Sequence, residues 1–218
     1  MPLLSDPGTA NKYSNLGFEI AARIVEVVSG QSYEDFVKSR ILDPLGMKDT
    51  TFNPTDEQLD RSIVLYSVSS GATAVRQREN AWAPLPHNGP TVKVSAAAGL
   101  WSTARDQLRF YKMLMNLGLS EDGTRILKEE TVRNLLAVSS RPRNLDGDVG
   151  YSLGFAAPVN DGDDAWFGHG GAWGTNCMVN WHKRQLKLWV VQLVGGPRPW
   201  DKDRQGALER FFLSRKAR

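Results

Sequence analysis

The chain has 218 residues, of which 41% are hydrophobic and 23% are charged, and its formal net charge is +3. This composition is ordinary for a globular domain with a substantial core. Lysine and arginine are spread along the sequence and form no basic block, which argues against nucleic-acid binding. The sequence has no stretch of about 18 or more apolar residues, so no transmembrane helix is expected.

Cys177 is the single cysteine of the chain, and it lies in an alternating apolar run. We therefore predict a buried, unreactive thiol. No histidine has other ligand-type residues at metal-binding spacing, which predicts no metal site; the three are His87, His169 and His182. Residues 1–15 lack the basic region and long apolar run of a signal peptide, and the sequence leaves the compartment open.

The first predicted helix covers residues 16–29, where apolar residues recur at helical spacing. Asn15 is expected to be its N-cap and Gly30 to end it. A second helix is predicted to begin after Ser32, because Ser32 with Asp35 forms an acidic variant of the capping box.

Residues 48–95 show few regular patterns, and we expect mostly loop with short extended pieces. Thr103 with Asp106 then predicts a helix start. The expected buried face and stop of this helix are Leu108, Tyr111, Leu114, Met115 and Gly118. Residues 128–138 are predicted to form a further helix.

The apolar period changes after residue 143. Short β-branched or aromatic runs, typical of strands, occupy residues 151–157, 165–169, 175–181 and 186–194. His182–Gln185 is predicted to link the last two runs as a hairpin, and residues 203–215 form a final amphipathic helix. We therefore predict one α+β domain: residues 1–143 mainly helical and loop, residues 144–218 an antiparallel meander with the last helix packed on it.

Two short stretches could carry chemistry. "KYSNLGF" places Tyr13 and Asn15 directly before a helix, and "FGHGGAWGTN" places His169 among four glycines between strand-like runs. Glycine permits positive φ angles and close approach of a ligand to the backbone. Each stretch also has a plain structural interpretation: a helix cap and a loop aromatic for the first, a glycine-rich turn for the second.

Together, these stretches resemble the second and third motifs of the serine β-lactamase-like superfamily. That superfamily includes class C β-lactamases, penicillin-binding DD-peptidases, family VIII esterases and D-amino-acid peptidases. Tyr13 and Asn15 match its Y-x-N motif, and His169 to Gly171 match its K-T-G or H-x-G motif. The likeness extends through "PGT", "AAGLWSTARDQLRFYKMLMN" and "YSLGF", and so covers nearly the whole chain. It implies a β-lactamase/transpeptidase-like fold.

The resemblance also implies roles for particular residues. Tyr13 would be the general base and acid, Asn15 would bind the substrate amide or orient its neighbours, and His169 would position the tyrosine or bind a substrate carboxylate. Gly170 and Gly171 would let substrate lie along the strand edge, and the Ala172 N–H would be one oxyanion donor. The implied reaction is acyl-serine hydrolysis of a β-lactam, an ester or a D-peptide amide, without a cofactor.

The nucleophile of that reaction belongs to an S-x-x-K motif, and the 218 residues contain none. Only Thr9 carries a hydroxyl three residues before a lysine, and it lies in the loop before Tyr13. "STAR" at Ser102 to Arg105 is not equivalent, because an arginine stays protonated and cannot act as the base. In the family S-x-x-K lies well upstream of Y-x-N, so we expect an N-terminal part with the serine, its lysine and the first strands to be absent.

Such a chain would expose a sheet edge and apolar surface, so self-association is expected. His169 in place of lysine favours an esterase-like member. The resemblance is compatible with a periplasmic or secreted parent protein. Two other interpretations stay open: a family relative that binds small-molecule ligands without chemistry, and a fragment that works only with a complementing N-terminal chain.

Overall fold

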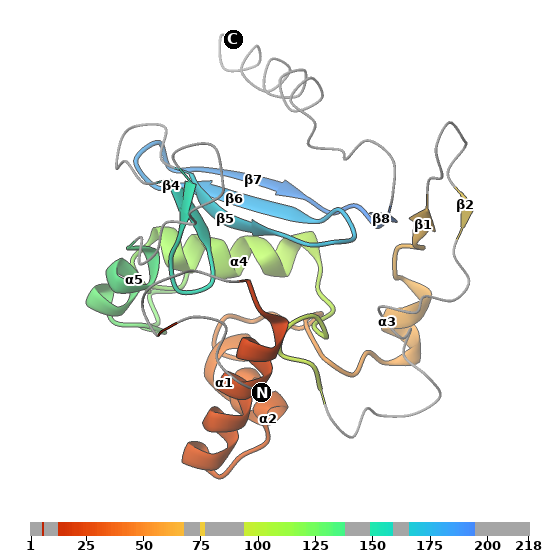
Figure 1. Cartoon of the computed structure of the whole chain (residues 1–218), viewed down its shortest axis with the longest axis horizontal. Coiled ribbons are helices and arrows are strands. Elements are labelled where there is room, and N and C mark those ends of the chain that lie inside the picture. Colours follow the sequence, from red (N-terminus) through yellow and green to blue (C-terminus); the bar gives the residue numbers. More distant parts are fainter. Residues whose placement is uncertain are drawn as a thin grey trace, which may run out of the picture.

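The computed structural model describes residue 6 and residues 13–67, 75–76, 94–137, 149–158 and 166–194. Within these ranges, helices dominate the first part of the chain and strands the last (Figure 1). The helices are α1 (Asn15–Ser29), α2 (Tyr33–Val37), the π-helix η1 (Lys38–Leu42), α3 (Asp56–Asp60), α4 (Ala104–Met115) and α5 (Glu129–Leu136).

The strands form two sheets. The larger is an antiparallel sheet in the order β3-β4-β5-β6-β7, and the smaller has the order β2-β1-β8. The strand bounds are β1 (Tyr66–Ser67), β2 (Val75–Arg76), β3 (Val149–Tyr151), β4 (Ala156–Pro158), β5 (Phe167–Gly170), β6 (Asn176–Asn180), β7 (Gln185–Trp189) and β8 (Leu193–Val194).

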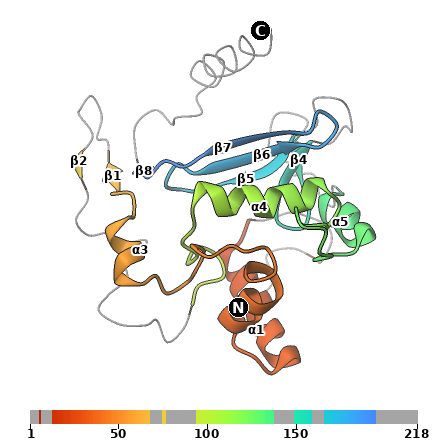
Figure 2. The ribbon, with the colours of Figure 1, turned by 180° about the vertical axis from the view of Figure 1, so that it is seen from behind.

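Helix α4 lies along one face of the five-stranded sheet, as Figures 1 and 2 both show, and it contacts β6 and β7. Its buried side chains meet those of the sheet because the apolar positions of α4 recur at helical spacing. The core between them includes Tyr111, Met113, Leu114, Phe167 and Val179. This packing fixes the strand that carries His169 against a rigid helix.

Helices α1 and α2 lie together beside α4, away from the sheet (Figure 1). Gly30 ends α1 in the left-handed conformation, with φ 70°, as the sequence predicts. Ser32 caps α2, since its hydroxyl accepts from the Asp35 N–H and donates to the Asp35 carboxylate. The predicted capping pair is therefore confirmed, and η1 continues the helical path for one more turn.

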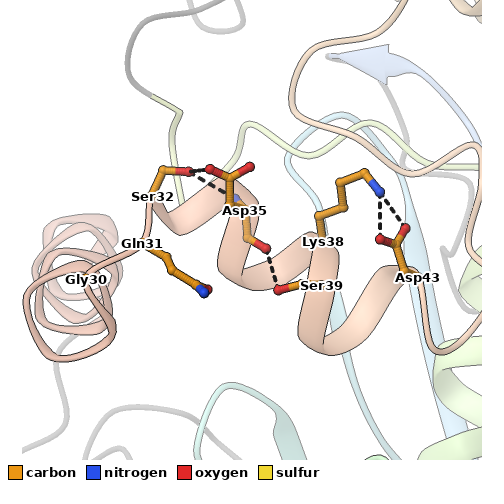
Figure 3. Close-up of a pocket in the computed structure, with 7 residues that line it drawn as sticks. All are labelled: Gly30, Gln31, Ser32, Asp35, Lys38, Ser39 and Asp43. Carbon is orange, nitrogen blue, oxygen red and sulfur yellow. Dashed lines mark hydrogen bonds and ion pairs between the residues drawn. The ribbon is translucent and has the colours of Figure 1, made fainter.

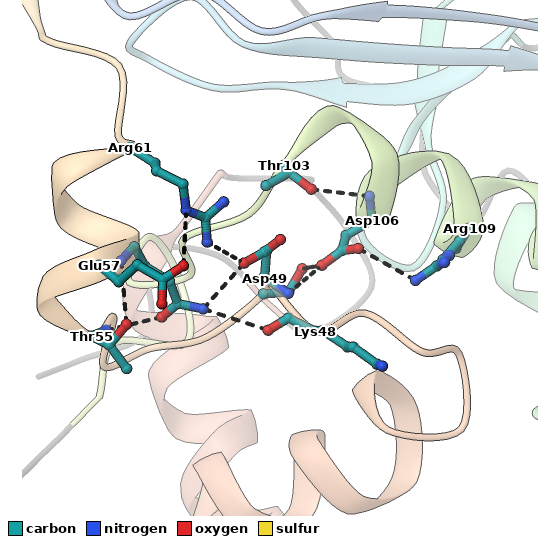
Figure 4. Close-up of polar contacts among 10 residues, drawn as sticks. Lys48, Asp49, Thr55, Glu57, Arg61, Thr103, Asp106 and Arg109 are labelled. Atoms are coloured by element: carbon teal, nitrogen blue, oxygen red, sulfur yellow. Dashed lines mark hydrogen bonds and ion pairs between the residues drawn. The ribbon is translucent and has the colours of Figure 1, made fainter.

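A polar network joins α3 to the start of α4 (Figure 4). Arg61 donates to the Asp49 carboxylate at 2.7 Å, and the Asp49 N–H donates to Asp106 at 2.8 Å. Asp106 is buried, and Thr103 caps α4 by accepting from the Asp106 N–H. The predicted start of this helix is confirmed. Because a buried carboxylate must be hydrogen-bonded, this network fixes the segment around residue 49 against α4.

The structure changes some details of the predicted local structure. Helix α3 begins at a Thr55–Gln58 capping box inside the stretch expected to be mostly loop. Leu108 is 36% exposed, and Met113 takes its place in the buried face of α4. The helix expected around residues 128–138 is confirmed as α5, which covers Glu129–Leu136.

The large sheet is the antiparallel meander that the sequence predicted, but the strand bounds differ. Residues 151–157 bend at 152–155 and belong to two strands, β3 and β4, while residues 186–194 divide into β7 and β8. Strand β8 leaves the large sheet and pairs in parallel with β1, in the register Tyr66↔Leu193. Local apolar patterns could not reveal this pairing, because it joins segments far apart in the sequence. The predicted final helix, residues 203–215, lies outside the described residues.

Candidate active site

The first part of the site is the N-terminus of α1. Ser14, and not Asn15, is the N-cap, since its hydroxyl accepts from the Gly17 N–H at 3.2 Å. The capping role expected for Asn15 is therefore wrong. Serine and asparagine are about equally favourable as N-caps. The backbone of Ser14 has the extended conformation of an N-cap, so Asn15 is the first helical residue. Its exposed side chain has no hydrogen-bond partner among the described residues.

The second part of the site is strand β5, which carries His169. This strand lies between β4 and β6 in the large sheet. Its pairing with β4 is confined to Ala156↔Gly168, whereas its pairing with β6 continues through His169↔Cys177 and Gly170↔Asn176. The β4 side of β5 is therefore unpaired from His169 onward within the part of the chain that the structure describes.

The glycines of this segment have different physical roles. A Cβ at Gly168 would lie 1.9 Å from the Cys177 carbonyl oxygen, and one at Gly171 would lie 2.3 Å from Thr175 Oγ1. Gly168 is therefore required by the backbone packing of the hairpin, whereas a side chain at Gly171 would require the Thr175 hydroxyl to move. A Cβ at Gly170 would meet nothing closer than 3.7 Å. Gly170 is thus the glycine that leaves space beside the strand.

The turn between β5 and β6 is held by a 2.7 Å hydrogen bond from the Gly171 N–H to the Thr175 carbonyl. The interpretation of this segment as a glycine-rich turn between strands is therefore confirmed as its local structure. Ala172 at the tip is exposed, and its N–H has no acceptor in the described parts of the chain. A backbone N–H without an acceptor can donate to an incoming oxyanion.

The fold brings the two parts together. The ring of Tyr13 stacks against the imidazole of His169, with centroids 6.2 Å apart and planes inclined by 26°. Tyr13 is 65% exposed and His169 is partly buried. A phenol and an imidazole placed side by side at a solvent-accessible position can exchange protons with a third group that approaches them.

The structure adds one residue that the sequence pattern did not single out. Glu19, in the second turn of α1, accepts hydrogen bonds from the turn at Ser95 to Ala97. No motif marks this contact, because the two segments lie far apart in the sequence.

One pocket among the described residues lies elsewhere. It has a volume of about 450 Å³ and opens beside α2 and η1, and it contains none of the predicted site residues (Figure 3). Lys38 in its wall is paired with both oxygens of Asp43, at 2.6 and 2.7 Å, and Asp35 is bonded to Ser32. Its charged groups already have partners, so it offers little to a ligand.

No group of three metal-ligating side chains occurs among the described residues. The same part of the chain includes no helix long and apolar enough to cross a membrane.

A family model described as Beta-lactamase matches residues 1–209. The chain belongs to the beta-lactamase family. The fold of this family member is β-lactamase/transpeptidase-like, with helices packed on an antiparallel sheet, as the sequence predicted.

Curated relatives of this family member include Protein Rv1367c of Mycobacterium tuberculosis, 34% identical over 133 residues, which cover 61% of the chain and 32% of the relative. Lovastatin esterase of Penicillium rubens is 28% identical over 235 residues, which cover 97% of the chain and 57% of the relative. The chain spans about a third of the length of the first of these relatives.

Solved structures agree on the fold. The octameric penicillin-binding protein homologue from Pyrococcus abyssi has a TM-score of 0.69 at 24% identity, with 90% of this chain and 42% of that one covered. The simvastatin synthase LovD of Aspergillus terreus has a TM-score of 0.75 at 21% identity, with 94% and 55% covered. Much of each of these larger chains has no counterpart in the 218 residues.

Proposed function

We propose that this chain supplies the tyrosine, histidine and strand components of a serine hydrolase site that acts on an ester, an amide or a β-lactam. The observation that carries the proposal is the stacking of Tyr13 on His169, with centroids 6.2 Å apart. The Y-x-N and H-x-G motifs lie far apart in the sequence and come from a helix start and a sheet, yet they meet at one exposed place.

Within this proposal, Tyr13 carries the proton between nucleophile and leaving group, and His169 orients the phenol or binds a carboxylate of the substrate. Asn15 presents its amide to the substrate from the first turn of α1. The unpaired side of β5 at Gly170 receives the substrate backbone, Gly171 shapes the turn, and the Ala172 N–H donates to the oxyanion. No step requires a cofactor.

The site described so far has no nucleophile. The 218 residues contain no S-x-x-K, and Thr9 lies outside the described residues. Ser102 is engaged elsewhere, since its hydroxyl shares a 2.8 Å hydrogen bond with Thr50 at the base of α4. We propose that a serine supplied by an S-x-x-K segment completes the site.

The names of relatives bear on the substrate class. They include a D-alanyl-D-alanine-carboxypeptidase/endopeptidase of Escherichia coli, 31% identical over 114 residues, and the lovastatin esterase. Histidine at position 169, in place of the lysine of K-T-G, supports an ester substrate, because a lysine is the stronger fixed partner for a substrate carboxylate. We therefore propose esters as the first substrates to test.

The test is an assay with p-nitrophenyl esters and a chromogenic cephalosporin, run on the chain together with a polypeptide that carries an S-x-x-K segment and followed by mass spectrometry for an acyl adduct. Turnover that falls by about 10² to 10⁴ in Tyr13→Phe would support Tyr13 as a proton carrier. Tyr66→Phe is the matched control, because Tyr66 is also an exposed tyrosine but lies in β1. Turnover that is equal in Tyr13→Phe and wild type would overturn the proposal.

A second candidate is a binding module or complementation fragment of the same fold. The absence of S-x-x-K from the 218 residues favours it. It predicts no turnover and no acyl adduct, but saturable binding of the cephalosporin that weakens in His169→Ala. Addition of a polypeptide that carries S-x-x-K would then restore turnover only if the chain is a complementation fragment.

A further inference from the structure

Glu19 holds a turn that is far from it in the sequence. Its Oε1 accepts from the Ser95 hydroxyl at 2.6 Å and from the Ala97 N–H at 3.3 Å, and its Oε2 accepts from the Ala96 N–H at 3.3 Å. Both carboxylate oxygens are therefore used. Hydrogen bonds to an ionised acceptor are stronger than neutral ones, and these are partly shielded from water.

The turn that Glu19 binds is rigid in its own right. It is closed by a 2.9 Å hydrogen bond from the Gly99 N–H to the Ser95 carbonyl. A Cβ at Gly99 would lie 2.8 Å from that carbonyl oxygen, so only glycine fits this close approach. A rigid turn of this kind holds Glu19 at a fixed position relative to the residues that follow the turn.

The turn leads directly to α4 and the sheet. Trp101 and Thr51 exchange two backbone hydrogen bonds, at 2.8 and 3.0 Å, and Thr103 then caps α4. Helix α4 packs on the sheet that carries His169. A chain of fixed contacts thus runs from Glu19 through the turn and α4 to β5.

Glu19 itself belongs to α1, and Tyr13 precedes the start of this helix by two residues. Among the described residues, Ala22 is the one buried side chain of α1, so apolar packing holds this helix weakly. Polar bonds must therefore set its position. The Glu26 carboxylate accepts from the Tyr33 N–H at 3.2 Å and so ties α1 to α2.

We infer that Glu19 is a positioning residue of the candidate site: by holding the turn at Ser95 to Ala97, it sets α1, and with it Tyr13, at stacking distance from His169. This role for Glu19 rests on the proposed function of Tyr13 and His169. Because it concerns only the position of Tyr13 relative to His169, it can be tested without any turnover.

The experiment uses the His169 ring signal in proton NMR, assigned by its loss in His169→Gln; the chain has three histidines. The stacked phenol gives this signal a ring-current shift, and Tyr13→Ala defines its position without the stack. We expect Glu19→Ala to move the signal most of the way to that position and to speed amide exchange at Ala96 and Ala97. Glu57→Ala, which removes an exposed carboxylate from α3, should leave both readouts unchanged.

Two milder variants cover the case in which Glu19→Ala fails to fold. Ser95→Ala removes the 2.6 Å bond from the other side, and Glu19→Gln keeps one acceptor oxygen, so both should give intermediate shifts. If amide exchange at Ala96 rises while the His169 signal stays at its wild-type position, Glu19 holds only the turn, and the inference is wrong. Loss of turnover in Tyr13→Phe tests the proposed function separately, whatever the NMR shows.

Discussion

The phenol ring of Tyr13 lies 6.2 Å, centroid to centroid, from the imidazole ring of His169, and the two planes are inclined by only 26°. Tyr13 precedes a helix that packs beside α2, whereas His169 belongs to an internal strand of the large sheet. The site is therefore assembled across two layers of the fold, and its geometry depends on how those layers are held together.

His169 should set the preference between ester and carboxylate-bearing substrates. In His169→Lys, the ratio of cephalosporin to ester turnover, or of binding if no turnover occurs, should rise roughly tenfold or more, since a hydrogen bond to a charged group is worth about 1.5–3 kcal/mol. The matched control is His182→Lys, in the exposed turn before β7. An unchanged ratio would exclude contact between residue 169 and a substrate carboxylate.

Gly168 and Gly170 should respond differently to the same substitution. Gly168→Ala forces a Cβ to within 1.9 Å of the Cys177 carbonyl, so we expect a loss of about 3 kcal/mol or more in the free energy of unfolding. Gly170→Ala meets nothing closer than 3.7 Å and should cost about 0.5 kcal/mol or less. Urea unfolding measures both. The prediction fails if the two variants are equally stable.

Two leucines of α4 offer a second matched pair. Leu114 has no exposed surface, whereas Leu108 is 36% exposed. Leu114→Ala should destabilise the fold by about 2–5 kcal/mol, because it removes buried methyl groups and leaves a cavity against the sheet. Leu108→Ala should cost about 1 kcal/mol or less. Chemical denaturation checks the difference, and a larger cost at Leu108 would contradict the observed packing of α4.

The thiol of Cys177 should make stability depend on alkaline pH. Burial raises the pKa of Cys177 from 9.0 to about 12, opposed by a hydrogen bond from Tyr111. The unfolded chain loses this proton near its ordinary pKa while the folded chain keeps it, so the contribution is full below pH 9.0 and is lost as pH rises toward 12.

Unfolding by urea at a series of alkaline pH values measures this loss. The Cys177→Ala variant should lose less stability over the same range, since the buried thiol is then absent. In native wild type, a thiol reagent should react with Cys177 only at the rate of unfolding. Fast modification of the native protein would show that the thiol is accessible.

The self-association expected from exposed apolar surface can be tested at the apolar stripe of α1. Its exposed residues lie at helical spacing and are Leu16, Ile20, Ile24, Val27 and Val28. Exposed stripes of this kind favour association, and a symmetric contact uses one patch from each copy. Light scattering should show mass rising with concentration in wild type, and Ile24→Glu should reduce it. Gln31→Glu adds the same charge just past α1 and should not. A wild-type chain that stays monomeric at all concentrations would refute the self-association.

The sequence by itself determined the family, the α+β class and most helix boundaries. Capping pairs such as Ser32–Asp35 and Thr103–Asp106 are local, so they can be read from neighbouring residues. The motifs around Tyr13 and His169 were also visible, because each is a short run of residues. Local chemistry failed where two neighbours were equally suitable, as with Ser14 and Asn15 at the start of α1, and the Thr55–Gln58 capping box of α3 was missed.

Only the tertiary structure decided which distant segments meet. The pairing of β8 with β1, the internal place of β5, and the contact of Glu19 with the Ser95 turn all join residues far apart in the sequence. Such contacts depend on the packing of whole elements, and no local pattern encodes them. The stack of Tyr13 on His169 belongs to both categories. The sequence supplied the two residues, and the packing of helices and sheet placed them 6.2 Å apart.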